Sequence, residues 1–146
     1  MEQRSKATAN WQGGLADGSG TTRLGTGIGG EMAMSWTART EGADGQSSPE
    51  ELLAGAHATC FNMALSKVLA DAGHPPARLE TTATTTFETG GEQGSHVAST
   101  HLSVHGSVPG MDTDTFLHAA ETAAQNCPIS KALRGNIEIT VDSSLN

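Results

Sequence analysis

The sequence predicts an α+β fold in a single domain that covers residues 1–146. Three observations support this class. A helical segment from Pro49 to about Ala72 has no charged residue between Leu52 and Leu65, short segments of strand-like alternation lie on both sides of it, and no repeat or low-complexity linker divides the chain. A chain of 146 residues is long enough to bury a core without disulfides or metals.

The N-terminal third predicts a hairpin and one further strand. Residues 6–11 alternate between apolar and polar, turn residues follow, and a Thr-rich strand resumes over residues 21–24. A half-buried strand is predicted over residues 31–40, where Met34 and Trp36 share one face. A glycine-rich segment then ends this strand before the long helix.

The long helix has well-marked ends. Ser48 is the predicted N-cap, Pro49 takes the first helical position, and Glu51 lies three residues after the cap to complete a capping box. Gly73 ends the helix, and two prolines follow. Because the helix is apolar on nearly every face, it is predicted to be a buried central helix, with Cys60 near its middle.

The second half of the chain repeats this alternation of strands and helices. The predicted elements are strands over residues 79–89 and 96–108, a helix over 113–125 capped by Asp112, a short helix from Pro128, and a closing strand over 136–142.

Composition limits the partners and the location. The net charge is -8 with few basic residues, which argues against nucleic acid and anionic membranes as partners. No apolar run is long enough for a transmembrane helix or a signal peptide, so a cytoplasmic location is expected. Aromatic residues make up only 3% of the chain, which predicts a core of small volume that a dimer interface would supplement.

The two cysteines have different predicted environments. In a reducing compartment they could be inert buried thiols, a redox pair or part of a metal site. Cys127 immediately precedes Pro128 at the start of a helix, where unpaired N–H groups stabilise a thiolate. Cys60 lies mid-helix in apolar surroundings, so its pKa should be raised and it should be inert unless a cation approaches it.

Three residues are candidate partners for Cys60. His57 lies three residues before it on the same helix face, and Arg39 closes the preceding strand. Glu50 lies ten residues before Cys60, about 15 Å away along a helix axis, so it cannot touch the cysteine of its own helix. Glu50 would therefore act from another subunit or orient an arginine.

The stretch SSPEELLAGAHATCFNMALS, followed 67 residues after its cysteine by NCPISKAL, resembles the OsmC/Ohr family of osmotically inducible and organic hydroperoxide resistance proteins. The shared features are the Pro-Glu opening, the spacing from glutamate to cysteine, the cysteine-phenylalanine pair and the later Cys-Pro. The predicted order of elements covers the whole chain in the same way.

This resemblance implies an OsmC-like fold with a long buried central helix, in an intertwined homodimer with two active sites at its interface. It implies a thiol peroxidase that reduces organic hydroperoxides to alcohols. Cys60 matches the peroxidatic cysteine, Cys127 the resolving cysteine that forms a disulfide with it, and Glu50 the acidic partner.

Two positions compete for the arginine that stabilises the thiolate. The Ohr branch has it in the early hairpin, where this chain has Thr21 with Arg23 nearby. The OsmC branch has it just before the central helix, in a run that resembles ARTEG at Arg39. We favour Arg39, held by Glu50 through a bidentate pair.

Other components follow from the same resemblance. Phe61, Met63 and Met111 are candidate lining for an alkyl or lipid hydroperoxide. The reductant would be a dithiol such as dihydrolipoamide on a carrier protein, or thioredoxin. No cofactor is expected, since the glycines of GTGIGGE do not form a nucleotide-binding loop.

Three alternatives remain at this point. A metal site could use His57, Cys60 and Cys127, with a fourth ligand from His96, His101 or His105, although no metal is expected. A Cys-His hydrolase could use His57 as its base. A non-enzymatic protein of the same fold could bind a hydrophobic ligand without consuming peroxide.

Overall fold

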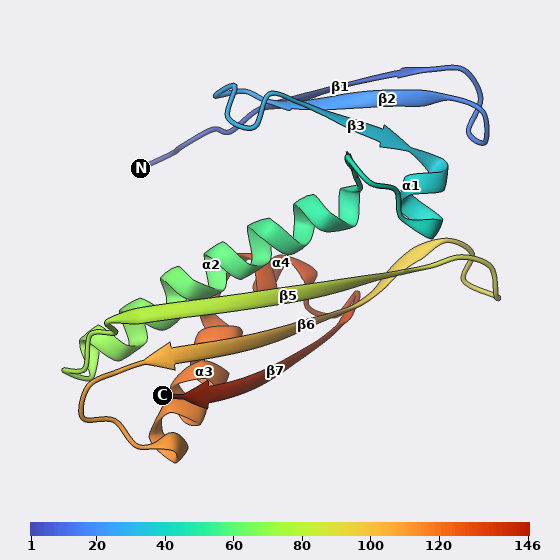
Figure 1. The fold of residues 1–146 in the computed structure, drawn as a ribbon. Helices are drawn as coiled ribbons and strands as arrows, with labels where there is room; N and C mark the ends of the chain where they lie inside the picture. Colours follow the sequence, from blue (N-terminus) through green and yellow to red (C-terminus); the bar gives the residue numbers. More distant parts are fainter. The chain divides into compact units, whose positions relative to one another are not determined.

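The computed structural model describes all residues from 1 to 146 and divides into two compact units, Met1–Leu52 and Leu53–Asn146. Figure 1 labels the helices and most of the strands of both units. Each unit contains its own sheet, and four helices accompany the two sheets. This confirms the predicted α+β class, whereas the single domain stays a prediction.

The first unit contains a four-stranded sheet in the order β1-β2-β3-β4. β1 and β2 form the predicted antiparallel hairpin, β3 pairs antiparallel with β2, and β4 runs parallel to β3. Their bounds are β1 Ala7–Gln12, β2 Ser19–Leu24, β3 Glu31–Ser35 and β4 Gln46–Ser47.

The predicted strand over residues 31–40 is wrong in its second half. β3 ends at Ser35, and the six residues Trp36–Glu41 form helix α1. The Ser35 hydroxyl accepts a hydrogen bond from the Ala38 amide at 3.1 Å, which is an N-cap, and Gly42 closes the helix with a φ of 78°. The cap outweighs the strand-like alternation, and it places Arg39 on a helix.

Helix α2 (Pro49–Asp71) begins and ends as predicted. The Ser48 hydroxyl accepts from the Glu51 amide at 3.1 Å. The capping box itself is not closed, because the Glu51 carboxylate accepts from the Ser47 hydroxyl instead. At the other end Gly73 takes a φ of 84°, and the His74 amide donates to the Leu69 carbonyl at 2.9 Å.

Burial along α2 is confined to one side in the single chain. His57, Phe61, Leu65 and Leu69 are fully buried, at spacings of four residues, whereas Met63 is 69% exposed. The side of α2 away from the core therefore presents one large apolar side chain to solvent.

The second unit contains a three-stranded sheet in the order β5-β6-β7. β5 and β6 are antiparallel, and β7, the predicted closing strand, runs parallel to β6. A parallel pair needs a long crossover, which α3 and α4 provide. The bounds are β5 Arg78–Glu88, β6 His96–Ser107, α3 Thr113–Asn126, α4 Pro128–Leu133 and β7 Glu138–Leu145.

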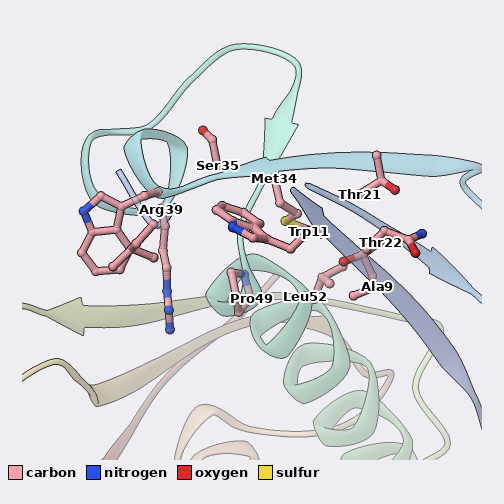
Figure 2. Close-up of a pocket in the computed structure, with 12 residues that line it drawn as sticks. Ala9, Trp11, Thr21, Thr22, Met34, Ser35, Arg39, Pro49 and Leu52 are labelled. Atoms are coloured by element: carbon pink, nitrogen blue, oxygen red, sulfur yellow. The ribbon is translucent and has the colours of Figure 1, made fainter. Parts of the chain in front are cut away.

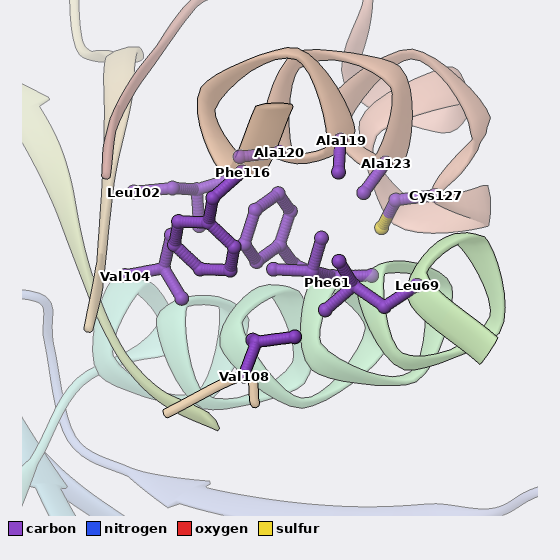
Figure 3. Packing of buried hydrophobic residues seen from close by; sticks show 11 residues of the cluster. Phe61, Leu69, Leu102, Val104, Val108, Phe116, Ala119, Ala120, Ala123 and Cys127 are labelled. Carbon is purple, nitrogen blue, oxygen red and sulfur yellow. The ribbon is translucent and has the colours of Figure 1, made fainter. Parts of the chain in front are cut away.

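The core of the second unit lies between α2, α3 and β6, and Figure 3 shows it at close range. Phe61 of α2 and Phe116 of α3 are its two largest buried side chains. Gly106 of β6 lies directly against the Phe116 ring, where a Cβ atom would come within 2.5 Å of ring carbon Cζ. No helix of the chain is both long and apolar enough to cross a membrane.

Candidate functional site

Arg39 of α1 and Glu50 in the first turn of α2 form the main ion pair of the first unit. The Arg39 Nε donates to Glu50 Oε1 at 3.2 Å and to Oε2 at 3.1 Å, and Nη2 donates to Oε1 at 2.7 Å. The Glu50 side chain is 7% exposed and that of Arg39 is 31% exposed. The two residues therefore form the predicted bidentate pair, in which Glu50 fixes the plane of the guanidinium.

An apolar groove of about 530 Å³ adjoins this pair within the first unit. Figure 2 shows Trp11 and Met34 facing this space from β1 and β3, with Leu52 on the α2 side. Arg39 is the only charged residue of the lining, so the groove combines an apolar wall with one guanidinium. Thr21 lines the groove, whereas Arg23 is exposed and does not.

The three residues predicted to line a substrate pocket do not line this groove. Phe61 is fully buried in the core, and Met111 packs partly buried against the same core. Met63 borders a shallower hollow of about 450 Å³ beside Arg78 and Leu79. Their contact with a substrate stays a prediction.

The two cysteines lie together in the second unit although 67 residues separate them in the sequence. Cys60 is half-buried on α2, and Cys127 is fully buried at the junction of α3 and α4. Cys60 packs against the core cluster that includes Cys127 and lies near enough for Cys127 to raise its pKa, and both are free thiols. The fold thus brings together the two sulfurs that the sequence singled out.

The first turn of α4 influences Cys60. Burial raises the pKa of Cys60 above its ordinary value of 9.0, the nearby Ile129 amide lowers it, and the neighbouring Cys127 raises it. Cys127 itself precedes α4 without a side-chain capping hydrogen bond, so the contact with the helix start that was predicted for this cysteine is absent.

His57 does not pair with Cys60 in the way its spacing allowed. Its Nε2 forms a 2.7 Å hydrogen bond with the Ser130 hydroxyl of α4, and both side chains are fully buried. Its Nδ1 is buried without a hydrogen-bond partner. Burial lowers the pKa of His57 below 6.5, so the ring is neutral near pH 7.

The histidines of β6 lie on the polar face of the sheet. His101 bonds to Thr140 at 2.7 Å, and His105 bonds to Ser144 at 2.8 Å. His96 bonds to the Gly94 carbonyl at 3.0 Å. No group of three or more His, Cys, Asp or Glu side chains in the chain is arranged to hold a metal ion.

Sequence reasoning did not identify Ile129, Ser130 or the groove. One signal was available for Ser130, because HATC and CPIS each place a polar residue three positions from a cysteine. Such residues share a helix face, so two helices that join their cysteines also bring these polar residues together.

Comparisons with known proteins show which family the chain resembles. Residues 42–142 match the model of the OsmC-like protein family. Peroxiredoxin OsmC of Escherichia coli strain K12 is 35% identical over 145 residues, which are 99% of each chain. Organic hydroperoxide resistance protein-like 1 of Staphylococcus epidermidis is 33% identical over 103 residues, which are 68% of this chain and 71% of that protein. The crystal structure of an organic hydroperoxide resistance protein from Elizabethkingia anophelis, 27% identical, covers 100% of both chains with a TM-score of 0.74.

Proposed function

Because this chain belongs to the OsmC-like family, we propose that it is a thiol-dependent peroxidase that reduces organic hydroperoxides to alcohols. The observation that carries the proposal is the contact between the thiols of Cys60 and Cys127. Relatives named peroxiredoxin and organic hydroperoxide resistance protein support the same reaction class.

In the proposed reaction, the Cys60 thiolate attacks the terminal oxygen of the hydroperoxide. The O–O bond breaks, an alkoxide leaves and takes up a proton to become the alcohol, and Cys60 becomes a sulfenic acid. The Cys127 thiol then displaces water from this sulfenic acid and forms the Cys60–Cys127 disulfide. Disulfide formation protects Cys60 from further, irreversible oxidation.

The thiolate needs a cation, because burial and Cys127 both raise the pKa of Cys60. We assign this role to Arg39, whose guanidinium Glu50 holds in a fixed plane. Ten residues along α2 put Glu50 about 15 Å from the Cys60 of its own helix. The proposal is therefore that the pair from one subunit serves the thiol of its partner in a homodimer.

Two features of the single chain support a homodimer. The exposed Met63 lies in the charge-poor middle of α2, and the groove in the first unit is lined mainly by apolar side chains. Phe61, Met63 and Met111 are kept as proposed contacts of an alkyl or lipid chain.

The reductant is proposed to be a dithiol, either dihydrolipoamide on a carrier protein or thioredoxin. A dithiol reduces the disulfide by exchange and becomes a disulfide itself, so the cycle needs no bound cofactor. The cytoplasm, where such dithiols are kept reduced, is the proposed location.

The test measures mass and free thiols of the reduced protein before and after one equivalent of cumene hydroperoxide. The parent should lose about two mass units and both thiols, Cys127→Ser should overoxidise, and Cys60→Ser should not react. A parent protein that keeps its mass and both free thiols would refute the proposed peroxidase activity. The apolar groove would then favour the alternative, a protein that binds hydrophobic ligands without consuming peroxide.

A further inference from the structure

The hydrogen bond between His57 and Ser130 joins the same two helices as the cysteine pair. His57 and Cys60 lie on α2, while Ser130 lies in the first turn of α4 just after Cys127. The bond spans 73 residues of sequence, measures 2.7 Å, and is fully buried at both ends. A buried polar bond of this kind is costly to break, because each group would be left without water or a partner.

The positions of the four residues are matched. His57 precedes Cys60 by three residues, and Ser130 follows Cys127 by three. The pairs His57–Ser130 and Cys60–Cys127 therefore have the order expected when the two segments run antiparallel. Three helical residues advance by about 4.5 Å, so the polar contact lies one turn from the sulfur contact. Sliding α4 along α2 by one residue would break both contacts at once.

The imidazole of His57 is held by one hydrogen bond. Nδ1 is buried without a partner, so Nε2 is the atom through which the ring is held to α4. Cys127, by contrast, is the N-cap residue of α4 but makes no side-chain capping hydrogen bond. The position of Cys127 therefore depends on its neighbours, among which Ser130 makes the polar contact to α2.

Disulfides form only in a narrow range of geometry, with Cα atoms about 4.4–6.8 Å apart. We propose that His57 and Ser130 are a positioning pair that sets the register of α4 against α2, so that Cys127 closes on Cys60. This inference rests on the proposed peroxidase function, and it gives the two residues a positioning role and no part in the bond-making steps.

The positioning pair would influence which of two competing reactions consumes the Cys60 sulfenic acid. The Cys60 sulfenic acid either condenses with the Cys127 thiol and releases water, or reacts with a second hydroperoxide to give a sulfinic acid and an alcohol. A displaced Cys127 favours the second path. Both paths start from the same sulfenic acid, so their ratio does not depend on how fast that acid forms.

The first experiment measures this ratio by mass after exposure to excess cumene hydroperoxide. Disulfide lowers the mass by about 2, and sulfinic acid raises it by about 32. Ser130→Ala and His57→Leu should each raise the ratio of sulfinic acid to disulfide at least about fivefold, and the double variant should equal either single one. His57→Gln, whose side-chain amide can either donate to or accept from the Ser130 hydroxyl in place of Nε2, should stay near the parent.

The matched control is Thr100→Val. Thr100 is also fully buried, and its hydroxyl bonds to that of Thr85 at 3.0 Å, on strands β6 and β5. This variant loses a comparable hydrogen bond away from the cysteines and should keep the parent ratio. The positioning role would be overturned if Ser130→Ala kept the parent ratio, or if Thr100→Val changed it equally.

The second experiment needs no peroxidase activity. In glutathione buffers, oxidised glutathione converts the dithiol to the Cys60–Cys127 disulfide and releases two reduced glutathiones. Ser130→Ala should lower this equilibrium constant at least about threefold, and His57→Gln should not. A parent that forms the disulfide here but ignores hydroperoxide would refute the proposed function alone. An equal constant in parent and Ser130→Ala would refute the positioning pair alone.

Discussion

The Arg39 guanidinium is held to the Glu50 carboxylate by three hydrogen bonds, the shortest of them 2.7 Å. Glu50 follows Arg39 by eleven positions, and the two belong to different helices, Arg39 to α1 and Glu50 to the first turn of α2. The carboxylate is nearly buried and the guanidinium is partly open to solvent. The cation is therefore fixed in orientation and still accessible to an anion.

Replacing Arg39 should raise the pKa of Cys60. Without the guanidinium, burial and Cys127 would leave that pKa above 9.0, so the Arg39→Met variant should be alkylated by iodoacetamide only in strongly alkaline solution. The parent should react at lower pH. Peroxidase turnover at pH 7 should fall on the order of 100-fold.

Arg23→Met is the matched control, because Arg23 is exposed on β2 and does not line the groove. It should keep the parent's alkylation profile and turnover. If Arg23→Met lost activity and Arg39→Met did not, the role of stabilising the Cys60 thiolate would be assigned to Arg23.

Acid should destabilise the protein through His57. Burial lowers the pKa of His57 in the folded state, so the unfolded chain binds the proton more readily. The stability from the neutral ring is present above pH 6.5 and is lost as the pH falls through the lowered pKa. Urea unfolding near pH 7 and near pH 5 should show a larger loss in the parent than in His57→Gln. Equal losses would mean that the ring is not buried as a neutral group.

Adding a methyl group at Gly106 should disturb the core. A Cβ atom there would meet three Phe116 ring carbons at 2.5, 2.9 and 3.3 Å, and the ring is fully buried. Gly106→Ala should lower the free energy of unfolding by about 1–3 kcal/mol, as overpacking does. Ser107→Ala, at the next position of β6, should change it by less than about 0.5 kcal/mol. A Gly106→Ala protein as stable as the parent would show that the Phe116 ring moves freely.

A charge at Met63 should weaken the proposed homodimer. Sedimentation equilibrium of the parent should give twice the chain mass, and Met63→Glu should shift the equilibrium toward single chains because a buried carboxylate is costly. Leu117→Glu, at an exposed apolar position on α3, should leave the dimer intact. A dimer unaffected by Met63→Glu would place the interface elsewhere.

The elements with clear local signals could be predicted from the sequence. The long helix has Ser48 and Pro49 at one end and Gly73 at the other, and Asp112 accepts from the Thr115 amide as the predicted cap of α3. Strand-like sequence predicted β5, which is rich in threonine, and β6. These features depend on residues within a few positions of one another, which a sequence displays directly.

Features that depend on long-range contact could not be predicted in the same way. The alternation of apolar and polar residues continues through Trp36 and favoured a longer strand. In the structure Ser35 instead caps a helix, and α1 begins at Trp36. The contact of Cys60 with Cys127 was implied only by family resemblance, because no local pattern specifies which helices meet. The Ile129 amide at Cys60 depends on the same meeting of α2 with α4.

The distance in sequence between the cysteines also matters during synthesis. Cys60 leaves the ribosome 67 residues before Cys127, which at about 5–20 residues per second is roughly 3–13 s. Through that interval the nascent chain has Cys60 but neither Cys127 nor Ser130. In the proposed chemistry, the protection that Cys127 gives to an oxidised Cys60 therefore begins only once the start of α4 has been made.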